Sequence, residues 1–532
     1  MMFNVRLEEV FVPASTRVHT VWSRFGNVIP AAVSWTVVIA TIVGLALFPL
    51  TWMWISAASF AYFVAWIALH LVYFAIGQRR CRQWGQRDWA ADRDVAGPDG
   101  VTPADVWHLV LMPNYTEPIP ILRRTLDSLA AQHDAASRLV VVLGMEERES
   151  GSRAKGDLLA REYAGRFARV LVTMHPADLP GELPCKAANM RWAAQIVRDE
   201  AVSMGVDPST ATLSACDADS VFDPSYFAAI AELFARDVRR YSRFWQAPLF
   251  YYSNMWQVPA PTRFTARLAQ LYTLAELAIP GYDPLPISTY TMSLRMAQEC
   301  DWWDPAVIAE DWHVYLDYMV QRSGHVSVVP VYLPVLLDSA DGATWLSALK
   351  NRYVQLRRHA WGATDTGFLT EQLITGKTHA SVWFRFIQVL HDHVLPIVGF
   401  GAAATLSLVP LLWRTSGAGV AGGSASGIAL LALVVTGLFA ASTVTILASL
   451  AVDIVHYPPE SGGVAGVLLE IAKMWVLLPV AGLAFGVLPA LDAQTRLALG
   501  LPLEWHVTAK QLTVDEGSHS ESFPASLAGS DS

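Results

Sequence analysis

Long apolar stretches without a charged residue lie toward both ends of the chain. No Asp, Glu, Lys or Arg occurs from Phe25 to Gln78. A membrane-spanning helix needs about 20 apolar residues, so this stretch can hold two, with a break near Phe48–Thr51. Later charge-free stretches are His393–Trp413, Thr415–Val452 and Met474–Leu491. The pattern predicts two transmembrane helices at 27–78 and about three at 391–491, the last of which contains Pro479 and Pro489 and is either a span or a re-entrant segment.

Arginines follow the second apolar helix directly. The segment GQRRCRQWGQR carries Arg79, Arg80, Arg82 and Arg87, and the positive-inside rule places such a cluster in the cytosol. The first apolar stretch is too long for the core of a signal peptide and has no small-residue cleavage site after it. We therefore predict a multi-pass integral protein of the plasma or inner membrane, with a cytosolic segment at 1–26, a basic and polar linker at 79–103 and a cytosolic central domain.

Strand-like and helix-like patterns alternate in the central region, residues 104–342. Apolar runs of strand length are VWHLVLMP, RLVVVLG, ARVLVTM and ATLSAC, and between them lie the helical patterns PIPILRRTLDSLAAQ, AKGDLLAREYAGRF and CKAANMRWAAQIVRDEAV. Strands that alternate with helices predict a mostly parallel, doubly wound α/β sheet. Ligands of such sheets bind beyond the carboxyl ends of the strands, so polar residues at those ends are the first candidates for a site.

Amphipathic helices are expected at 343–390, before the third apolar helix. In TWLSALKNRYVQLRRHAWG the apolar residues recur at helical spacing, and Gly362 closes the pattern. A second segment, SVWFRFIQVLHDHV, leads into the next apolar stretch. Such helices beside membrane spans often lie in the interface, in contact with membrane lipids. The tail at 492–532 turns polar and rich in Ser and Gly, and we expect disorder from about residue 514.

Composition narrows the classes of protein further. Of the 532 residues, 53% are hydrophobic and 16% are charged, whereas about 25% are charged in a typical soluble domain. The net charge of −9 argues against nucleic acid as a partner. The four cysteines are scattered without a CxxC pair, which favours free thiols over disulfides or a zinc site.

Two aspartates follow the strand-like run ATLSAC. In ATLSACDADSVFDP, Asp217 and Asp219 would repel each other at the end of a buried strand unless a cation lay between them. Mg²⁺ and Mn²⁺ prefer oxygen ligands, and Mg²⁺ commonly binds one or two carboxylates together with substrate phosphates. The alternatives are a solvated turn or a cap for the next helix, a role that suits Asp223. A second DxD pattern, at Asp92 and Asp94, lies in the polar linker with no strand before it.

Further motifs stand in a fixed order around this pair. They are MPNYTEP from Met112, PGELPCKAANMRWA from Pro180, PAVIAEDWHVYLDYM from Pro305 and QLRRHAWG from Gln355. Together, and flanked by apolar helices, they resemble the membrane-embedded family 2 glycosyltransferases, the class of cellulose, chitin and hyaluronan synthases. The resemblance covers residues 104–365. It implies a Rossmann-like GT-A fold and a nucleotide-diphosphate sugar as donor, with a UDP-sugar expected.

The resemblance also implies roles for particular residues. The donor would be bound by Asn114, Tyr115, Glu117, Glu146, Lys186, Asn189, Asp217, Gln355 and Arg358, and Mg²⁺ or Mn²⁺ by Asp217 and Asp219. Lys186 also begins a helical pattern, where a phosphate binds favourably; the alternative is a solvated charge. Many relatives carry an aspartate for the nucleotide base at the end of the strand RLVVVLG, where Glu146 or Glu147 would serve here.

Catalysis would reside in PAVIAEDWHVYLDYM. In the family, the Asp of a Thr-Glu-Asp motif is the general base that accepts the proton of the acceptor hydroxyl. This assigns that role to Asp311, with Glu310 beside it, although Ala309 replaces the Thr. A positioned base contributes about 10²–10⁴-fold, and in-line displacement with one base inverts the anomeric centre. The alternative is that both acids only cap a helix.

Acceptor contacts are expected from the end of QLRRHAWG. Processive relatives carry Gln-x-x-Arg-Trp, and here His359 takes the position of that Trp. Trp361 would point about 200° away from position 359 on a continuous helix. We therefore expect His359 or Trp361 to contact the acceptor, and a histidine platform favours one transfer to a lipid over a threaded polymer. Tyr290 and Trp303 are further candidates, with aromatic packing as the alternative.

The sequence thus favours an inverting glycosyltransferase that acts on a lipid or glycan acceptor at the cytoplasmic membrane face. A processive synthase that extrudes its polysaccharide is the first alternative. A non-catalytic membrane protein, such as a transporter, is the second. It is disfavoured because the apolar helices are nearly free of charge and no repeated halves are visible.

Overall fold

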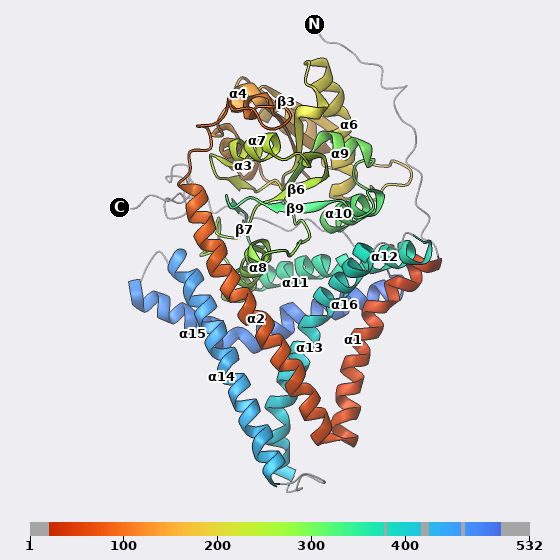
Figure 1. The fold of residues 1–532 in the computed structure, drawn as a ribbon, viewed down its shortest axis with the longest axis vertical. Helices are drawn as coiled ribbons and strands as arrows, with labels where there is room; N and C mark the ends of the chain where they lie inside the picture. The colour runs from red at the N-terminus through yellow and green to blue at the C-terminus, as the bar shows by residue number, and fades with distance from the viewer. Residues whose placement is uncertain (1–20, 377–379, 417–424, 459–462, 502–532) are drawn as a thin grey trace.

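The computed structural model describes residues 21–376, 380–416, 425–458 and 463–501, and it has two parts (Figure 1). A domain built on a β-sheet occupies one end of the molecule. Long apolar helices extend from it and converge at the other end. Residues 1–20 of the expected N-terminal segment and the tail beyond Leu501 lie outside the described residues.

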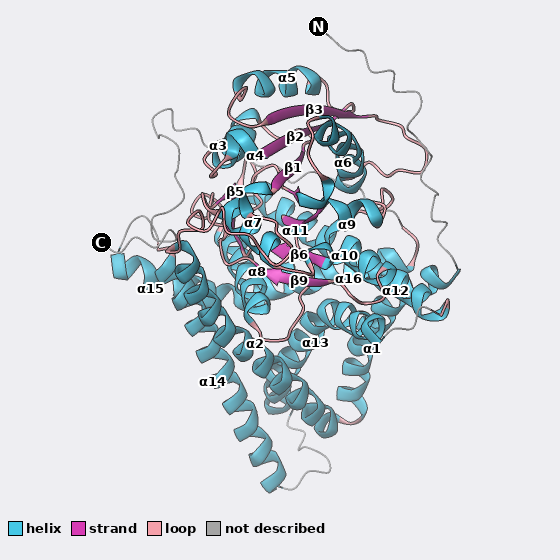
Figure 2. Cartoon of the chain, turned by 45° about the horizontal axis from the view of Figure 1, so that its top comes forward, coloured by secondary structure: helices cyan, strands magenta, loops and turns pink. Residues whose placement is uncertain are grey.

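The central sheet has seven strands in the order β3-β2-β1-β4-β8-β6-β9. Strand β8 is antiparallel to both of its neighbours, and the other pairings are parallel. The prediction of a mostly parallel α/β sheet is therefore confirmed, and Figure 2 shows the strands one beneath another with helices around them. The strands are β1 (Trp107–Pro113), β2 (Leu139–Glu146), β3 (Arg169–His175), β4 (Ala211–Ala215), β6 (Arg243–Gln246), β8 (Tyr290–Ser293) and β9 (Ser327–Pro330).

Helices cover both faces of this sheet because successive side chains of a strand point to opposite faces. Leu109 and Leu111 of β1 enter one core, while Val110 and Met112 enter the other. The first core includes residues of α6 (Lys186–Ser203), α8 (Ala260–Ala278) and α10 (Glu310–Gln321), and the second includes residues of α3 (Ile119–Ala130) and α7 (Tyr226–Arg236). The remaining elements here are α4 (Ala135–Arg138), α5 (Ser152–Glu162), α9 (Leu294–Glu299) and a small sheet of β5 (Val221–Phe222), β10 (Val335–Leu336) and β7 (Leu249–Phe250).

Five helical segments among the described residues are long and apolar enough to cross a membrane. Four of them run between the sheet domain and the far end of the molecule in Figure 1: α1 (Val21–Leu47), α2 (Pro49–Gly85), α13 (Ala380–Ser416) and α14 (Ala425–His456). Helix α2 continues past the expected boundary at Gln78 as far as Gly85. Its end is fixed to the sheet domain because Cys81 is buried and Arg80 Nη1 donates to Tyr332 Oη at 2.5 Å.

The fifth apolar segment lies across the other four, beneath the sheet domain (Figure 1). It comprises α15 (Gly463–Ala481), a π-helical turn at 482–487 and α16 (Leu488–Ala498). Two ion pairs join it to the domain side: Glu470 Oε1 lies 2.7 Å from Arg263 Nε of α8, and Asp492 Oδ2 lies 3.1 Å from Arg357 Nη1. The segment therefore packs along the floor of the sheet domain.

Helix α11 (Trp345–Ala360) forms part of the same floor. It begins with a capping box, in which Thr344 Oγ1 accepts the backbone N–H of Ser347 at 3.2 Å. The sequence predicts that the helix closes at Gly362. Instead, Trp361–Ala363 form a 3₁₀ turn and the chain continues as α12 (Thr364–Ile374).

Candidate active site

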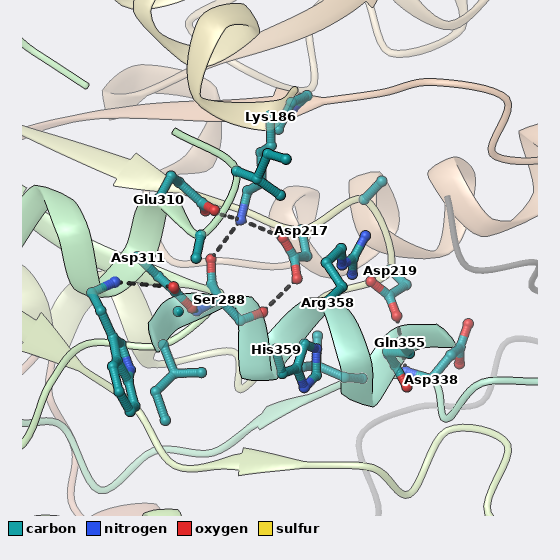
Figure 3. A pocket seen from close by; sticks show the side chains of 18 of the residues that line it. Lys186, Asp217, Asp219, Ser288, Glu310, Asp311, Asp338, Gln355, Arg358 and His359 are labelled. Atoms are coloured by element: carbon teal, nitrogen blue, oxygen red, sulfur yellow. Dashed lines mark hydrogen bonds and ion pairs between the residues drawn. The ribbon is translucent and has the colours of Figure 1, made fainter. Parts of the chain in front are cut away.

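A cavity of about 370 Å³ opens beyond the carboxyl ends of β1, β2 and β4 (Figure 3). Helices α8, α10 and α11 supply its other walls. Most of the residues singled out from the sequence line it together: Asn114, Tyr115, Glu117, Glu146, Lys186, Asn189, Asp217, Asp219, Glu310, Asp311, Gln355, Arg358 and His359. Motifs that are far apart in the sequence therefore share one site.

Lys186, the first residue of α6, lies between two acidic side chains (Figure 3). Its Nζ is 2.6 Å from Asp217 Oδ1 and 2.9 Å from Glu310 Oε1. It also donates to the backbone carbonyl of Ser288 at 2.9 Å. Burial alone would lower the pKa of Lys186, but Asp217 and Glu310 outweigh it and hold that pKa well above its usual value. A fixed lysine thus provides the cation that the strand-end aspartate requires.

Ser288 connects this cluster to Asp311. Its hydroxyl donates to Asp217 Oδ2, and its backbone N–H donates to Asp311 Oδ2 at 3.1 Å. The residue has φ 59°, in the left-handed region that non-glycine residues seldom adopt. Strain of this kind is often found at functional sites. The sequence marks Ser288 at most as a possible sugar contact, because an ordinary serine in a loop gives no signal for such a conformation.

Asp219 faces a second buried acid, Asp338. It is 2% exposed, and its Oδ2 accepts the backbone N–H of Asp338 at 3.0 Å. Asp338 in turn lies 2.7 Å from Arg124 Nη2 of α3. Sequence reasoning missed Asp338, although it follows the apolar run PVYLPVLL in the same way that Asp217 follows ATLSAC. An acid at the end of an apolar run was the available signal.

The carboxylates of this cavity suit a hard cation, because Asp217 and Asp219 offer only oxygen. Within the described ranges, no group of three or more His, Cys, Asp or Glu side chains is placed to hold a metal ion. Lys186 and the Ser288 hydroxyl also contact both oxygens of Asp217. The residues therefore fit Mg²⁺ or Mn²⁺ only as a partial ligand set, which the phosphates of a substrate would complete.

Glu310 and Asp311 form the first turn of α10. Burial raises the pKa of Glu310, Lys186 opposes this, and the charge of Asp311 adds to the rise. Burial likewise raises the pKa of Asp311, against Lys186 and two backbone N–H donors, those of Ser288 and Trp312. Carboxylates with raised pKa values are better proton acceptors near neutral pH than exposed ones. The arrangement supplies two candidate bases beside one fixed cation.

The end of β2 is held by a chain of polar contacts. Glu146 Oε1 accepts Asn189 Nδ2 at 2.9 Å, and Oε2 lies 3.2 Å from His175 Nδ1. Burial would lower the pKa of His175, but Glu146 and Glu182 raise it to about 9, so the ring is charged at neutral pH. Sequence reasoning missed His175 because its partner, Glu146, belongs to the neighbouring strand. Glu146 is thereby kept ionised at the cavity wall.

The loop after β1 folds around Glu117. Its Oε2 accepts the Asn114 amide at 2.9 Å and the Tyr115 backbone N–H at 2.7 Å. The guanidinium of Arg148 lies 4.8 Å from the centre of the Tyr115 ring, a cation–π distance. Asn114, Tyr115 and Glu117 therefore form one ordered wall at the end of the cavity nearest β2.

Helix α11 presents Gln355, Arg358 and His359 to the cavity. The His359 ring is exposed to the open cavity, and the protein around it, with Arg358 and Arg352 nearby, lowers its pKa below the usual value. It is therefore neutral at physiological pH. Trp361 lies in the 3₁₀ turn and does not line the cavity.

Tyr290 and Trp303, expected as acceptor contacts, lie elsewhere. Both are 0% exposed, and neither lines the cavity. Trp303 Nε1 donates to Tyr290 Oη at 2.7 Å within the hydrophobic core. The expectation is corrected: aromatic packing, the alternative reading, accounts for both rings because the antiparallel strand β8 carries Tyr290 into the sheet interior.

No family model and no curated protein matches the sequence. Among solved structures, the chain is similar to the mannosyltransferase PcManGT from Pyrobaculum calidifontis in complex with GDP-Man and Mn²⁺, with 15% identity, 79% of this chain and 98% of that chain covered, and a TM-score of 0.40. It is also similar to GalNAc-T7 with UDP, GalNAc and Mn²⁺, with 11% identity, 53% of this chain and 56% of that chain covered, and a TM-score of 0.30. A third similar structure is S. aureus TarS 1–349 in complex with UDP-GlcNAc, with 11% identity, 59% of this chain and 88% of that chain covered, and a TM-score of 0.29. These TM-scores are too low to support an argument about function.

Proposed function

We propose that the chain is an inverting glycosyltransferase of the membrane-embedded family 2 type, which moves a sugar from a nucleotide-diphosphate sugar to a lipid or glycan acceptor. The observation that carries the proposal is the cavity beyond β1, β2 and β4. Cationic and carboxylate side chains face each other there, directly above helices apolar enough to lie in a membrane. Transfer from a diphosphate donor to a hydroxyl requires both kinds of group.

The cationic side of the cavity would bind the donor. Arg358 and Gln355 stand one helical turn apart on α11, and Lys186 stands opposite at the start of α6. Charge-assisted hydrogen bonds to phosphate are about twice as strong as neutral ones. The nucleoside would be held by the residues that line the cavity around the ends of β1 and β2, which are Asn114, Tyr115, Glu117, Glu146 and Asn189.

Asp311 would act as the general base. The acceptor oxygen attacks the anomeric carbon and gives its proton to Asp311, while the bond from that carbon to the diphosphate breaks and the nucleoside diphosphate leaves with the electron pair. One displacement inverts the anomeric centre. Glu310 is the less suitable base because Lys186 Nζ lies 2.9 Å from its Oε1. That ion pair gives Glu310 the role of holding Lys186.

Asp217 and Asp219 would hold Mg²⁺ or Mn²⁺ together with the donor diphosphate. A bound divalent ion would offset the negative charge that develops on the departing diphosphate. Lys186 Nζ, 2.6 Å from Asp217, sits where it can share that task.

The acceptor would approach past His359, with the apolar helices on the lipid side. A neutral histidine at the wall offers a smaller and more polar surface than a tryptophan. This supports a single transfer to a lipid over a threaded polymer, which makes a processive synthase the second candidate. We assign the sheet domain to the cytosol from the arginines at the end of α2.

The test is a panel of radiolabelled nucleotide sugars supplied to the purified full chain with membrane lipids. We expect release of a nucleoside diphosphate and a labelled product in the lipid fraction. Label in long polymer would favour the processive alternative. Absence of nucleotide release from every sugar in the panel would reject the enzyme and leave a non-catalytic membrane protein.

A further inference from the structure

Arg352 is buried and has no acidic partner among the residues that the structure describes. Four arginines are buried in the described structure: Arg240, Arg267 and Arg352 at 1% exposure and Arg385 at 3%, the last paired with Asp283. Arg240 pairs with Asp99 at 2.7 Å, and Arg267 pairs with Asp453. For Arg352, no carboxylate in the described ranges lies within ion-pair distance; its two hydrogen bonds go to neutral groups. A buried charge without a counter-charge is unusual and points to a ligand of opposite sign.

The two hydrogen bonds of Arg352 connect α8 to the cavity wall. Its Nε donates to Thr265 Oγ1 of α8 at 2.8 Å, and its Nη1 donates to Gln355 Oε1 at 2.7 Å. Gln355 lines the cavity one helical turn before Arg358. Burial lowers the pKa of Arg352 to about 10, so the guanidinium remains charged at neutral pH.

The contact with Gln355 fixes which end of that carboxamide faces the cavity. An amide oxygen that accepts from Arg352 leaves the NH₂ group as the donor on the other side. Without Arg352, the carboxamide could rotate and present its oxygen to an incoming phosphate, which would repel it. The charge of Arg352 also reaches the cavity, since it helps to lower the pKa of His359.

We propose that Arg352 is a positioning residue of the donor site: it orients the Gln355 carboxamide with its NH₂ toward the donor diphosphate and places a buried, unneutralised positive charge behind it. This rests on the proposed function. The substrate class that satisfies Arg352 is thus an organic diphosphate, whose two or more negative charges complement Arg352, Arg358 and Lys186. Arg352 itself need not touch the ligand.

The test measures binding of UDP and of GDP to the detergent-purified full chain by calorimetry, before any turnover. Arg352→Met removes the charge at similar length, and we expect at least about tenfold weaker binding of the preferred nucleotide, because a charge-assisted contact is lost. Gln355→Ala should cause a comparable loss. The double variant should lose less affinity than the two single losses added together, because Arg352 acts in part through Gln355. Arg352→Lys should recover part of the affinity.

Lys350→Met is the matched control, because it removes one positive charge from an exposed position of the same helix. It should bind as wild type. If Arg352→Met proves unfolded by size exclusion, Thr265→Val takes its place. This variant removes the acceptor of Arg352 Nε, and we expect nucleotide binding to weaken by roughly three- to tenfold. If wild type binds a nucleotide and Arg352→Met, or Thr265→Val in its place, binds it with the same affinity, this inference is overturned and the proposed function is not. Wild type that binds neither nucleotide overturns the proposed function, and this inference with it.

Discussion

The ammonium group of Lys186 lies 2.6 Å from the Asp217 carboxylate, at the carboxyl end of β4. The same group lies 2.9 Å from Glu310, so one cation neutralises acids from two distant motifs. Lys186 is therefore a cation within the chain that offsets the repulsion between the strand-end carboxylates. It also makes the ionisation of the α10 acids depend on one lysine.

Replacement of Lys186 should therefore change the pH dependence of transfer. Lys186 lowers the pKa values of Glu310 and Asp311. In Lys186→Met both values rise, the base is deprotonated only at higher pH, and the acidic limb of the pH–rate profile should move up by about one unit or more. Lys186→Arg keeps the charge and should leave the limb in place. An unmoved limb in Lys186→Met would show that neither acid is the base.

Asp311→Asn should retain nucleoside diphosphate binding but lose transfer by at least about a hundredfold, because an amide cannot accept the proton. Binding by calorimetry and single-turnover transfer are the two measurements. Glu310→Gln is the comparison, expected to weaken donor binding as well because Lys186 loses a partner. Loss of binding and transfer together in Asp311→Asn, in a folded protein, would mean that Asp311 is structural.

Asp219→Asn should abolish the effect of divalent cations on nucleotide binding. It preserves the size of the side chain and an oxygen for the Asp338 backbone N–H, but removes the charge that a cation requires. The measurement is the Kd of the preferred nucleotide with Mn²⁺ and with chelator. Asp223→Asn is the control from the same segment, since Asp223 accepts the Ser225 backbone N–H and does not line the cavity. An undiminished Mn²⁺ effect in Asp219→Asn would reject the metal role.

His359→Ala should weaken acceptor use, whereas Trp361→Ala should leave it nearly unchanged, because only the histidine lines the cavity. If the ring acts as other aromatic platforms do, its loss corresponds to roughly 1–3 kcal/mol. The KM for the acceptor should rise with the donor KM unchanged. The opposite ranking of the two variants would identify Trp361 as the platform.

The elements that sequence patterns predict well are those with strong local signals. Strands β1 to β4 and helices α3, α5 and α6 match the expected runs within a few residues. The short strands β6 and β8 were not predicted, because RFWQ and YTMS carry no clear alternation and are stabilised by pairing with each other. Several residues singled out from the sequence that line the cavity stand at the end of an apolar strand, as Glu146 and Asp217 do, or at the start of a helix, as Lys186 does. Asp338, which ends another apolar run, was missed.

The remainder of the site depends on contacts between distant residues. His175 acquires its role from Glu146 on the adjacent strand, and Arg352 from Thr265, 87 positions away. For Tyr290 and Trp303 the sequence predicts a role that the structure does not give them. Both aromatic residues lie near a motif and are expected to contact the acceptor, but both are buried in the core. No local pattern distinguishes a core ring from a platform, because both are apolar.

If the chain lies in a membrane, as we propose, the crosswise course of α15 and α16 sets the number of times that the chain crosses it. Helices α1, α2, α13 and α14 run between the sheet domain and the far end, while the fifth apolar segment stays beneath the domain, bound through Glu470 and Asp492. An even number of crossings returns Leu501 to the compartment of the sheet domain, so a protease site introduced just after it should be cut from the same side as one in the 79–103 linker. Cleavage from opposite sides would require α15 and α16 to traverse the bilayer. Hydropathy alone counts this segment as a span, whereas its two ion pairs with the domain side lead us to propose that Val21 and Leu501 lie in the same aqueous phase.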